Sequence, residues 1–195
     1  MPSVPDEKDT LVDVLDKLRA AIADKVAGVP EPQVRTPGVP SGTNLLGLVK
    51  HLTMAEVWFF GRAFGRPFPE PLHWWDDDAE EGADLWATED ESRAEIVDRY
   101  GRACAHSDAT IAELDLDALG HVPSWPRPDV TLHSMLVHVL SETSRHAGHA
   151  DIVREHLDGA AGWSPTLSQV VVRDATAWER YRARIEAAAR SFETR

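Results

Sequence analysis

A chain of 195 residues with 43% hydrophobic and 27% charged side chains is expected to fold as one soluble globular domain. Its formal net charge of −13 argues against a nucleic-acid or anionic-membrane partner, because both partners need a positively charged surface. The single cysteine excludes an internal disulfide, and the chain has neither a membrane-length apolar run nor a secretion signal, so we expect a cytoplasmic protein.

Apolar residues recur at helical spacing in two segments of the N-terminal third. The first begins near Thr10 and is stopped by Gly28 and Pro30, and the second runs from near Thr43 to Gly65–Pro67. Between them, residues 28–42 contain four prolines and three glycines and are expected to form a connector. The two predicted core faces comprise Leu11, Val14, Leu15, Leu18, Ile22 and Val26, and Leu45, Leu48, Leu52, Ala55 and Phe59.

Residues 66–87, which include FPEPLHWWDDDAEEGADLW, have no periodicity and are predicted to form a long loop. A loop of this length often covers or lines a functional site. Trp74 and Trp75 either line a substrate pocket or anchor the loop on the core, whereas Asp76–Asp78 is expected to be a solvated acidic turn.

A capping-box pattern at Thr88 and Glu91 predicts the start of a third helix that runs to about Leu114. Cys104 lies on the apolar face of this helix and is expected to be a small core residue, not a nucleophile. A proline-marked loop, HVPSWPRPD, follows the helix.

The longest predicted helix begins after Thr131 and ends at Asp158–Gly159. A final helix, capped by Asp174 or Thr176, is expected to end about residue 192, and 167–172 (LSQVVV) is the one strand-like run. Four core helices plus one extra helix predict an all-α four-helix bundle with an additional C-terminal helix.

Two polar residues of the longest helix fall inside its predicted core stripe. On a helical wheel, Glu142 and His146 share the face of Met135, Val139 and Ala150. Their Cβ atoms should lie roughly 5–6 Å apart, so that one metal ion could be reached by both side chains. The other histidines of this helix lie along one edge of the stripe; they are His138, His149 and His156.

The second helix carries His51 on the flank of its apolar face. If the two faces meet, His51, Glu142 and His146 form a set of two imidazoles and one carboxylate, as in catalytic zinc and ferrous iron sites. A core histidine bonded to a glutamate one turn away needs no metal, however, and His51 could bond a backbone carbonyl. The pattern alone leaves both interpretations open. His138 and His156 are expected to be helix-edge histidines.

Three segments of the chain resemble the DinB-like superfamily, in particular its actinobacterial branch of mycothiol-dependent maleylpyruvate isomerases and mycothiol or bacillithiol S-transferases. They are VPSGTNLLGLVKHLTMAEVWFFGRAFG, RYGRACAHSDATIAELDLDALG and LHSMLVHVLSETSRHAGHADIVREHLDGAAGW, within residues 5–163. The resemblance implies a four-helix bundle over residues 1–163, with residues 164–195 as an extension packed on it. It also implies one divalent metal, usually zinc or nickel, bound by His51, Glu142 and His146, and it implies homodimers.

The resemblance further implies a thiol-dependent transferase or isomerase that acts on a small electrophilic substrate, with mycothiol as cosubstrate. His149 follows the last implied ligand and is the candidate for a catalytic proton shuttle. Two alternatives remain: a metal-dependent hydrolase that uses bound water, and a non-catalytic binding protein whose bundle the metal stabilises.

Overall fold

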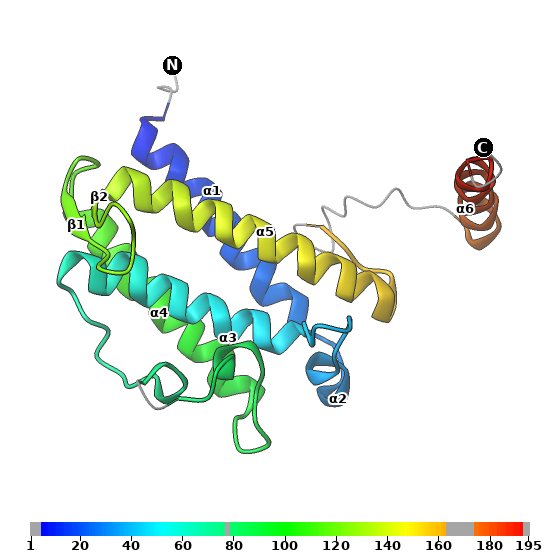
Figure 1. The fold of residues 1–195 in the computed structure, drawn as a ribbon, viewed down its shortest axis with the longest axis horizontal. Coiled ribbons are helices and arrows are strands. Elements are labelled where there is room, and N and C mark those ends of the chain that lie inside the picture. Colours follow the sequence, from blue (N-terminus) through cyan, green and yellow to red (C-terminus); the bar gives the residue numbers. More distant parts are fainter. Residues whose placement is uncertain (1–4, 77–78, 163–173, 193–195) are drawn as a thin grey trace.

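The computed structural model describes residues 5–76, 79–162 and 174–192. Four long helices form a bundle, in which α1 lies along α5 and α3 lies along α4, while α3 also contacts α5 (Figure 1). The expected all-α bundle with an additional C-terminal helix is therefore confirmed. The four bundle helices are α1 (Glu7–Val26), α3 (Leu45–Glu56), α4 (Arg93–Glu113) and α5 (Leu132–Asp158).

The sequence predicts most helix ends correctly because the caps are local. Asn44 caps α3 by accepting a hydrogen bond from the backbone N–H of Gly47 at 2.7 Å. Thr131 and Ser134 form a capping box at the start of α5. Asp174, one of the two predicted caps, begins α6 (Ala175–Arg190). None of the residues of α6 is buried, and α6 lies away from the bundle in Figure 1.

The predicted start of α4 is wrong. Glu91 does accept a hydrogen bond from the backbone N–H of Thr88 at 2.9 Å, yet the helix begins at Arg93 and its cap is Ser92. The carbonyl oxygens of Thr88 and Glu91 accept hydrogen bonds from the guanidinium group of Arg35. The box thus closes a turn that precedes the helix.

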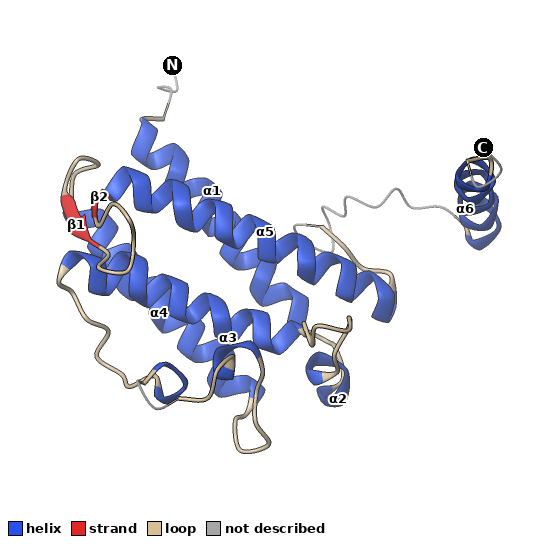
Figure 2. Cartoon of the chain, viewed as in Figure 1, coloured by secondary structure: helices blue, strands red, loops and turns tan. Residues whose placement is uncertain are grey.

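Two small elements were not predicted. The connector contains the short helix α2 (Glu31–Arg35). The proline-marked loop is flanked by β1 (Leu119–His121) and β2 (Asp129–Thr131), which form an antiparallel hairpin beside the start of α5 (Figure 2). A Cβ atom at Gly120 would lie 2.9 Å from the carbonyl oxygen of Ala63, so the hairpin packs closely on the end of the α3 segment. The strand-like run at 167–172 lies outside the described residues.

The long helix α3 changes pitch before it ends. It continues into the π-helical turn η1 (Val57–Gly61) and the 3₁₀ turn η2 (Arg62–Phe64), and ends at Gly65 with a φ of 68°. Such π-turns occur frequently at functional sites. Here the turn carries Phe59, whose ring packs against His138 of α5 with centroids 4.5 Å apart.

The predicted long loop over residues 66–87 contains two 3₁₀ turns, η3 (His73–Trp75) and η4 (Ala83–Leu85). The ring of Trp74 lies between two cations, 4.7 Å from Lys50 Nζ and 4.9 Å from the guanidinium carbon of Arg99. Trp75 packs edge-on against Trp58, with ring centroids 5.6 Å apart. Both tryptophans therefore anchor the loop, and both also line small cavities beneath it.

The core is mainly apolar along all four long helices, but an ion pair between two buried side chains lies inside it. Val14, placed in the core by its spacing, is 37% exposed. Arg19 and Glu56 are 6% and 1% exposed and form a two-pronged ion pair between α1 and α3. Within the described part of the chain, no helix is long and apolar enough to cross a membrane.

Candidate metal centre

The buried face of α5 lies slightly to one side of the predicted stripe. Glu142 and His146 flank this face, with side chains 29% and 14% exposed. The prediction that they lie inside the core is therefore wrong: they occupy its margin, where partial hydration reduces the cost of burying polar groups. The buried residues of α5 are Leu132, Met135, Leu136, Val139, Thr143, Ala147, Ala150 and Val153.

The structure brings His51 of α3 against this margin. His146 Nε2 lies 2.9 Å from Oε1 of Glu142, and His51 Nε2 lies 3.5 Å from the same oxygen. The two imidazole rings meet edge-on, with centroids 4.8 Å apart. One ligand atom from each of the three residues lies within 4.8 Å of the other two. The three side chains predicted to converge do so.

These separations suit a cation. Ligand atoms bound to zinc at roughly 2.0–2.2 Å in tetrahedral directions lie about 3.4 Å from one another. The distances from Glu142 Oε1 to Nε2 of His146 and to Nε2 of His51, 2.9 and 3.5 Å, lie on either side of this value. Two imidazole nitrogens and one carboxylate oxygen also form a set that leaves open coordination positions. The three side chains are therefore candidate ligands for a divalent metal.

Asp84 of η4 completes the surroundings of His51, and the sequence did not reveal it. Its Oδ2 atom lies 2.6 Å from Nδ1 of His51, on the opposite side of the ring from Glu142. His51 therefore contacts a carboxylate and not the backbone carbonyl considered from the sequence. The arrangement matches the carboxylate–histidine pairs that orient metal-binding imidazoles.

Burial and hydrogen bonding set the charges of the cluster. Burial opposes a charge on His51, but the hydrogen bonds to Asp84 and Glu142 outweigh it and raise the pKa of His51. For His146 burial prevails, and its pKa is lowered. Burial likewise opposes ionisation of Glu142, yet its contacts with His146 and His51 lower its pKa. The lowered pKa values of Glu142 and His146 favour an ionised carboxylate beside a neutral imidazole, which are the forms that bind cations, whereas the raised pKa of His51 favours its protonated form.

The other histidines of α5 differ from one another in their surroundings. His149 is exposed, and its Nδ1 atom lies 3.4 Å from Nδ1 of His146. His138 is half-buried between the rings of Phe59 and Trp125, and burial lowers its pKa. His156 is exposed, as expected. His149 is therefore the histidine outside the triad that is best placed to exchange protons beside it.

A cavity of about 520 Å³ adjoins the cluster. His146 and His149 form part of its lining, and the connector before α3 and the loop around η4 supply most of the rest. Its hydroxyl groups come from Ser41 and Thr43, and Glu81 contributes a carboxylate. A small polar molecule in this cavity would lie beside His146, one of the three converging side chains, and beside His149.

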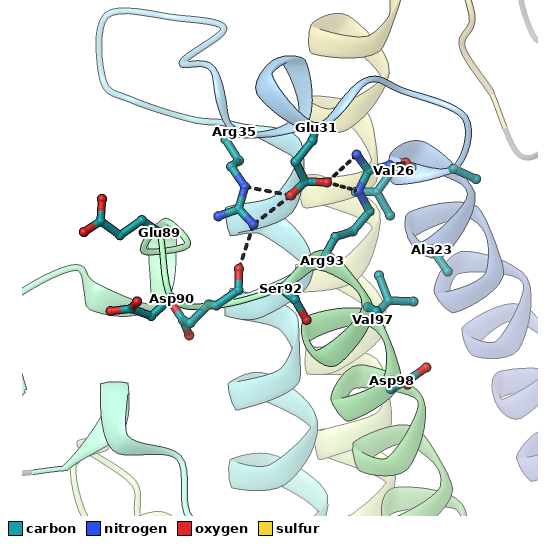
Figure 3. A pocket seen from close by; sticks show the side chains of 13 residues that line it. Ala23, Val26, Glu31, Arg35, Glu89, Asp90, Ser92, Arg93, Val97 and Asp98 are labelled. Atoms are coloured by element: carbon teal, nitrogen blue, oxygen red, sulfur yellow. Dashed lines mark hydrogen bonds and ion pairs between the residues drawn. The ribbon is translucent and has the colours of Figure 1, made fainter.

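A second cavity, of about 720 Å³, lies at the end of α1 and the start of α4. Figure 3 shows that Glu31 lies between Arg35 and Arg93 and bonds to both. Burial is slight at Glu31, and its hydrogen bond to Arg35 is the main reason that its pKa is lowered. The contacts among these side chains join α1, α2 and α4, which is a structural role.

Comparison with known proteins agrees with this geometry. A profile described as mycothiol-S-transferase matches residues 10–159. The chain belongs to the mycothiol-S-transferase family. The matched region includes His51, Glu142, His146 and His149, and it ends at the glycine that terminates α5. The DinB-like fold expected from the sequence is that of this family.

A solved structure shares the fold. It is described as a conserved protein of a locus from Enterococcus faecalis, with 16% sequence identity and a TM-score of 0.57. The match covers 80% of this chain and 99% of that chain. None of the curated proteins matches the chain significantly.

Proposed function

We propose that this protein is a metal-dependent S-transferase that joins mycothiol to a small electrophile. His51, Glu142 and His146 hold the divalent metal, which we take to be zinc, with nickel or iron as alternatives. The observation that carries the proposal is the convergence of these three side chains from α3 and α5 within 4.8 Å, in a chain of the mycothiol-S-transferase family.

The surroundings of the triad supply what the chemistry needs. A bound divalent ion ionises a thiol that coordinates it. The lowered pKa values of Glu142 and His146 favour the ionised carboxylate and the neutral imidazole, which are the forms that bind a cation. Such a thiolate would attack an electrophilic carbon and form a carbon–sulfur bond, while the leaving group would depart with the electron pair of the broken bond. His149, next to His146, would accept the proton that the thiol loses.

The cavity beside His146 and His149 would take the body of the thiol. Its volume of about 520 Å³ falls within the range of small-molecule sites. Mycothiol carries sugar and inositol hydroxyl groups, which hydrogen-bond to polar side chains such as those of Ser41, Thr43 and Glu81. The cavity therefore supports a polar, hydroxyl-rich cosubstrate.

The proposal is tested by incubating the zinc-loaded protein with mycothiol and monobromobimane. We expect the bimane thioether and bromide to form well above the uncatalysed rate, and the metal-free protein to add nothing to that rate. A parallel incubation with ester and amide substrates in the absence of thiol tests the hydrolase alternative. Failure to form any thioether above background with the metal-loaded protein would overturn the proposal. Whether the protein is a homodimer stays a prediction, which sedimentation equilibrium can test.

A further inference from the structure

The segment from Asp84 to Trp86 is attached to α3 at successive turns. The carbonyl oxygen of Leu85 accepts a hydrogen bond from Nδ2 of Asn44 at 3.1 Å, and that of Trp86 accepts one from Nζ of Lys50 at 2.9 Å. Lys50 is almost fully buried, so this bond is shielded from solvent. Two backbone groups of the segment are thus fixed on either side of the helical turn that leads to His51.

Gly47 makes this close packing of the segment on α3 geometrically feasible. A Cβ atom at this position would lie 1.9 Å from the carbonyl oxygen of Leu85 and 2.6 Å from its carbonyl carbon. Both are backbone atoms, so a side-chain rotation cannot relieve the clash. Any larger residue at this position would push the segment away from α3.

The attached segment brings Asp84 against His51. The Asp84 side chain is 15% exposed and that of His51 is 17% exposed, so their 2.6 Å contact is largely shielded. An imidazole that donates its Nδ1 proton to a carboxylate keeps the Nε2 lone pair free. In this protein Nε2 of His51 is the nitrogen that faces Glu142.

We propose that Asp84 is the positioning residue of the metal centre. It holds the His51 ring in the orientation and tautomer that aim Nε2 at the cation, and the attachment of Ala83–Leu85 to α3 is what delivers it. This inference rests on the proposed metal site. Because linkage is reciprocal, the bound metal must in turn strengthen the attachment of this segment to α3.

The test is the zinc affinity of Asp84→Ala and Asp84→Asn, measured by competition with a chromophoric chelator. Loss of such a carboxylate partner costs roughly 10- to 100-fold in metal affinity. We expect that loss for Asp84→Ala and a smaller one for Asp84→Asn, whose side-chain oxygen can still accept the Nδ1 proton. The visible spectrum of the cobalt-substituted protein should change in both variants, because the orientation of His51 changes.

Two further variants separate positioning from general damage. Gly47→Ala leaves Asp84 in the chain but displaces its segment, so it should weaken zinc binding about as much as Asp84→Ala. Asp129→Asn makes the same change in an aspartate that contacts His121 Nδ1 at 3.0 Å in the exposed hairpin, and it should leave zinc binding unchanged. Circular dichroism of the metal-free variants verifies that the bundle has formed.

Hydrogen exchange supplies a measurement that does not depend on activity. Adding zinc to the wild-type protein should slow amide exchange in residues 83–87, and the slowing should be lost in Asp84→Ala. Zinc affinities of Asp84→Ala and Gly47→Ala within twofold of the wild-type value would overturn the inference while leaving the metal centre intact. If the wild-type protein itself binds none of zinc, nickel and iron, the proposed function and this inference fail together.

Discussion

The Nε2 atom of His51 lies 3.5 Å from Oε1 of Glu142. This contact joins α3 to α5 at the margin of the core. The same oxygen lies 2.9 Å from Nε2 of His146. Two imidazoles thus point their Nε2 atoms at one carboxylate oxygen beside a cavity. A site that only stabilises the bundle could lie deeper in the core, whereas this one lies where a substrate can reach it.

His149 is predicted to act in proton transfer and not in metal binding. The change His149→Gln should lower the rate of mycothiol transfer about 100-fold, because the exposed imidazole beside His146 is replaced by a group that cannot titrate. Zinc content should stay at the wild-type value. The check is kcat as a function of pH together with elemental analysis. His156→Gln is the matched control, since His156 is exposed on the same helix and should be dispensable.

The Arg19–Glu56 pair is predicted to be the most sensitive polar contact of the core. Arg19→Met leaves the 1% exposed carboxylate of Glu56 without its two-pronged partner, and should cost about 3–5 kcal/mol of unfolding free energy. Replacing both residues, as in Arg19→Met with Glu56→Leu, should recover most of that loss. Urea unfolding measures both values. A double variant as unstable as the single one would contradict this explanation.

The contacts of Glu91 with Lys50 and with the backbone of Thr88 are predicted to stabilise the protein less at acid pH. Burial opposes its ionisation, but hydrogen bonds from Lys50 and from the backbone of Thr88 outweigh it and lower its pKa. A folded-state pKa below the unfolded one means that the stabilisation is complete above about pH 5 and is lost as the pH falls through the folded pKa. Glu91→Gln should therefore lower the melting temperature at pH 7, and the difference from wild type should shrink below about pH 4. Glu89→Gln, an exposed neighbour, should change neither value.

Cys104 is predicted to take no part in catalysis. It is half-buried against the core, and burial, aided by the charge of Glu56, raises the pKa of its thiol well above the usual range. Cys104→Ala should keep mycothiol transfer within about twofold of the wild-type rate. Iodoacetamide should modify the native protein far more slowly than the urea-unfolded protein. Loss of transfer in a folded Cys104→Ala variant would assign this thiol a role that its surroundings do not support.

Local patterns predicted the long helices, apart from the start of α4, and the spacing of the candidate site residues. The spacing of Glu142 and His146 placed them one turn apart on α5, and the flank position of His51 placed it toward them. The margin position of the pair was missed because a helical wheel gives directions but not the rotation of the helix against its neighbours. Spacing alone also misplaced Val14, which is 37% exposed.

Other contacts depend on how distant segments pack. Asp84 is 33 residues from His51, and it reaches it because backbone carbonyls of its segment bond to Asn44 and Lys50. No residue pattern in the loop predicts that its backbone carbonyls bond to Asn44 and Lys50. The Arg19–Glu56 pair likewise requires the register between α1 and α3. The division into a bundle over 1–163 and a C-terminal extension stays a prediction, which a chain truncated after residue 163 can test.

The most direct measurement is the metal content of the purified protein after reconstitution with zinc, compared with that of His51→Ala, Glu142→Gln and His146→Ala. The three side chains lie within 4.8 Å of one another, so we predict one zinc ion per wild-type chain. Each of the three variants should lose it, while His156→Ala should retain it. A wild-type chain that takes up no zinc, nickel or iron, or triad variants that bind metal as tightly as the wild type, would contradict the account.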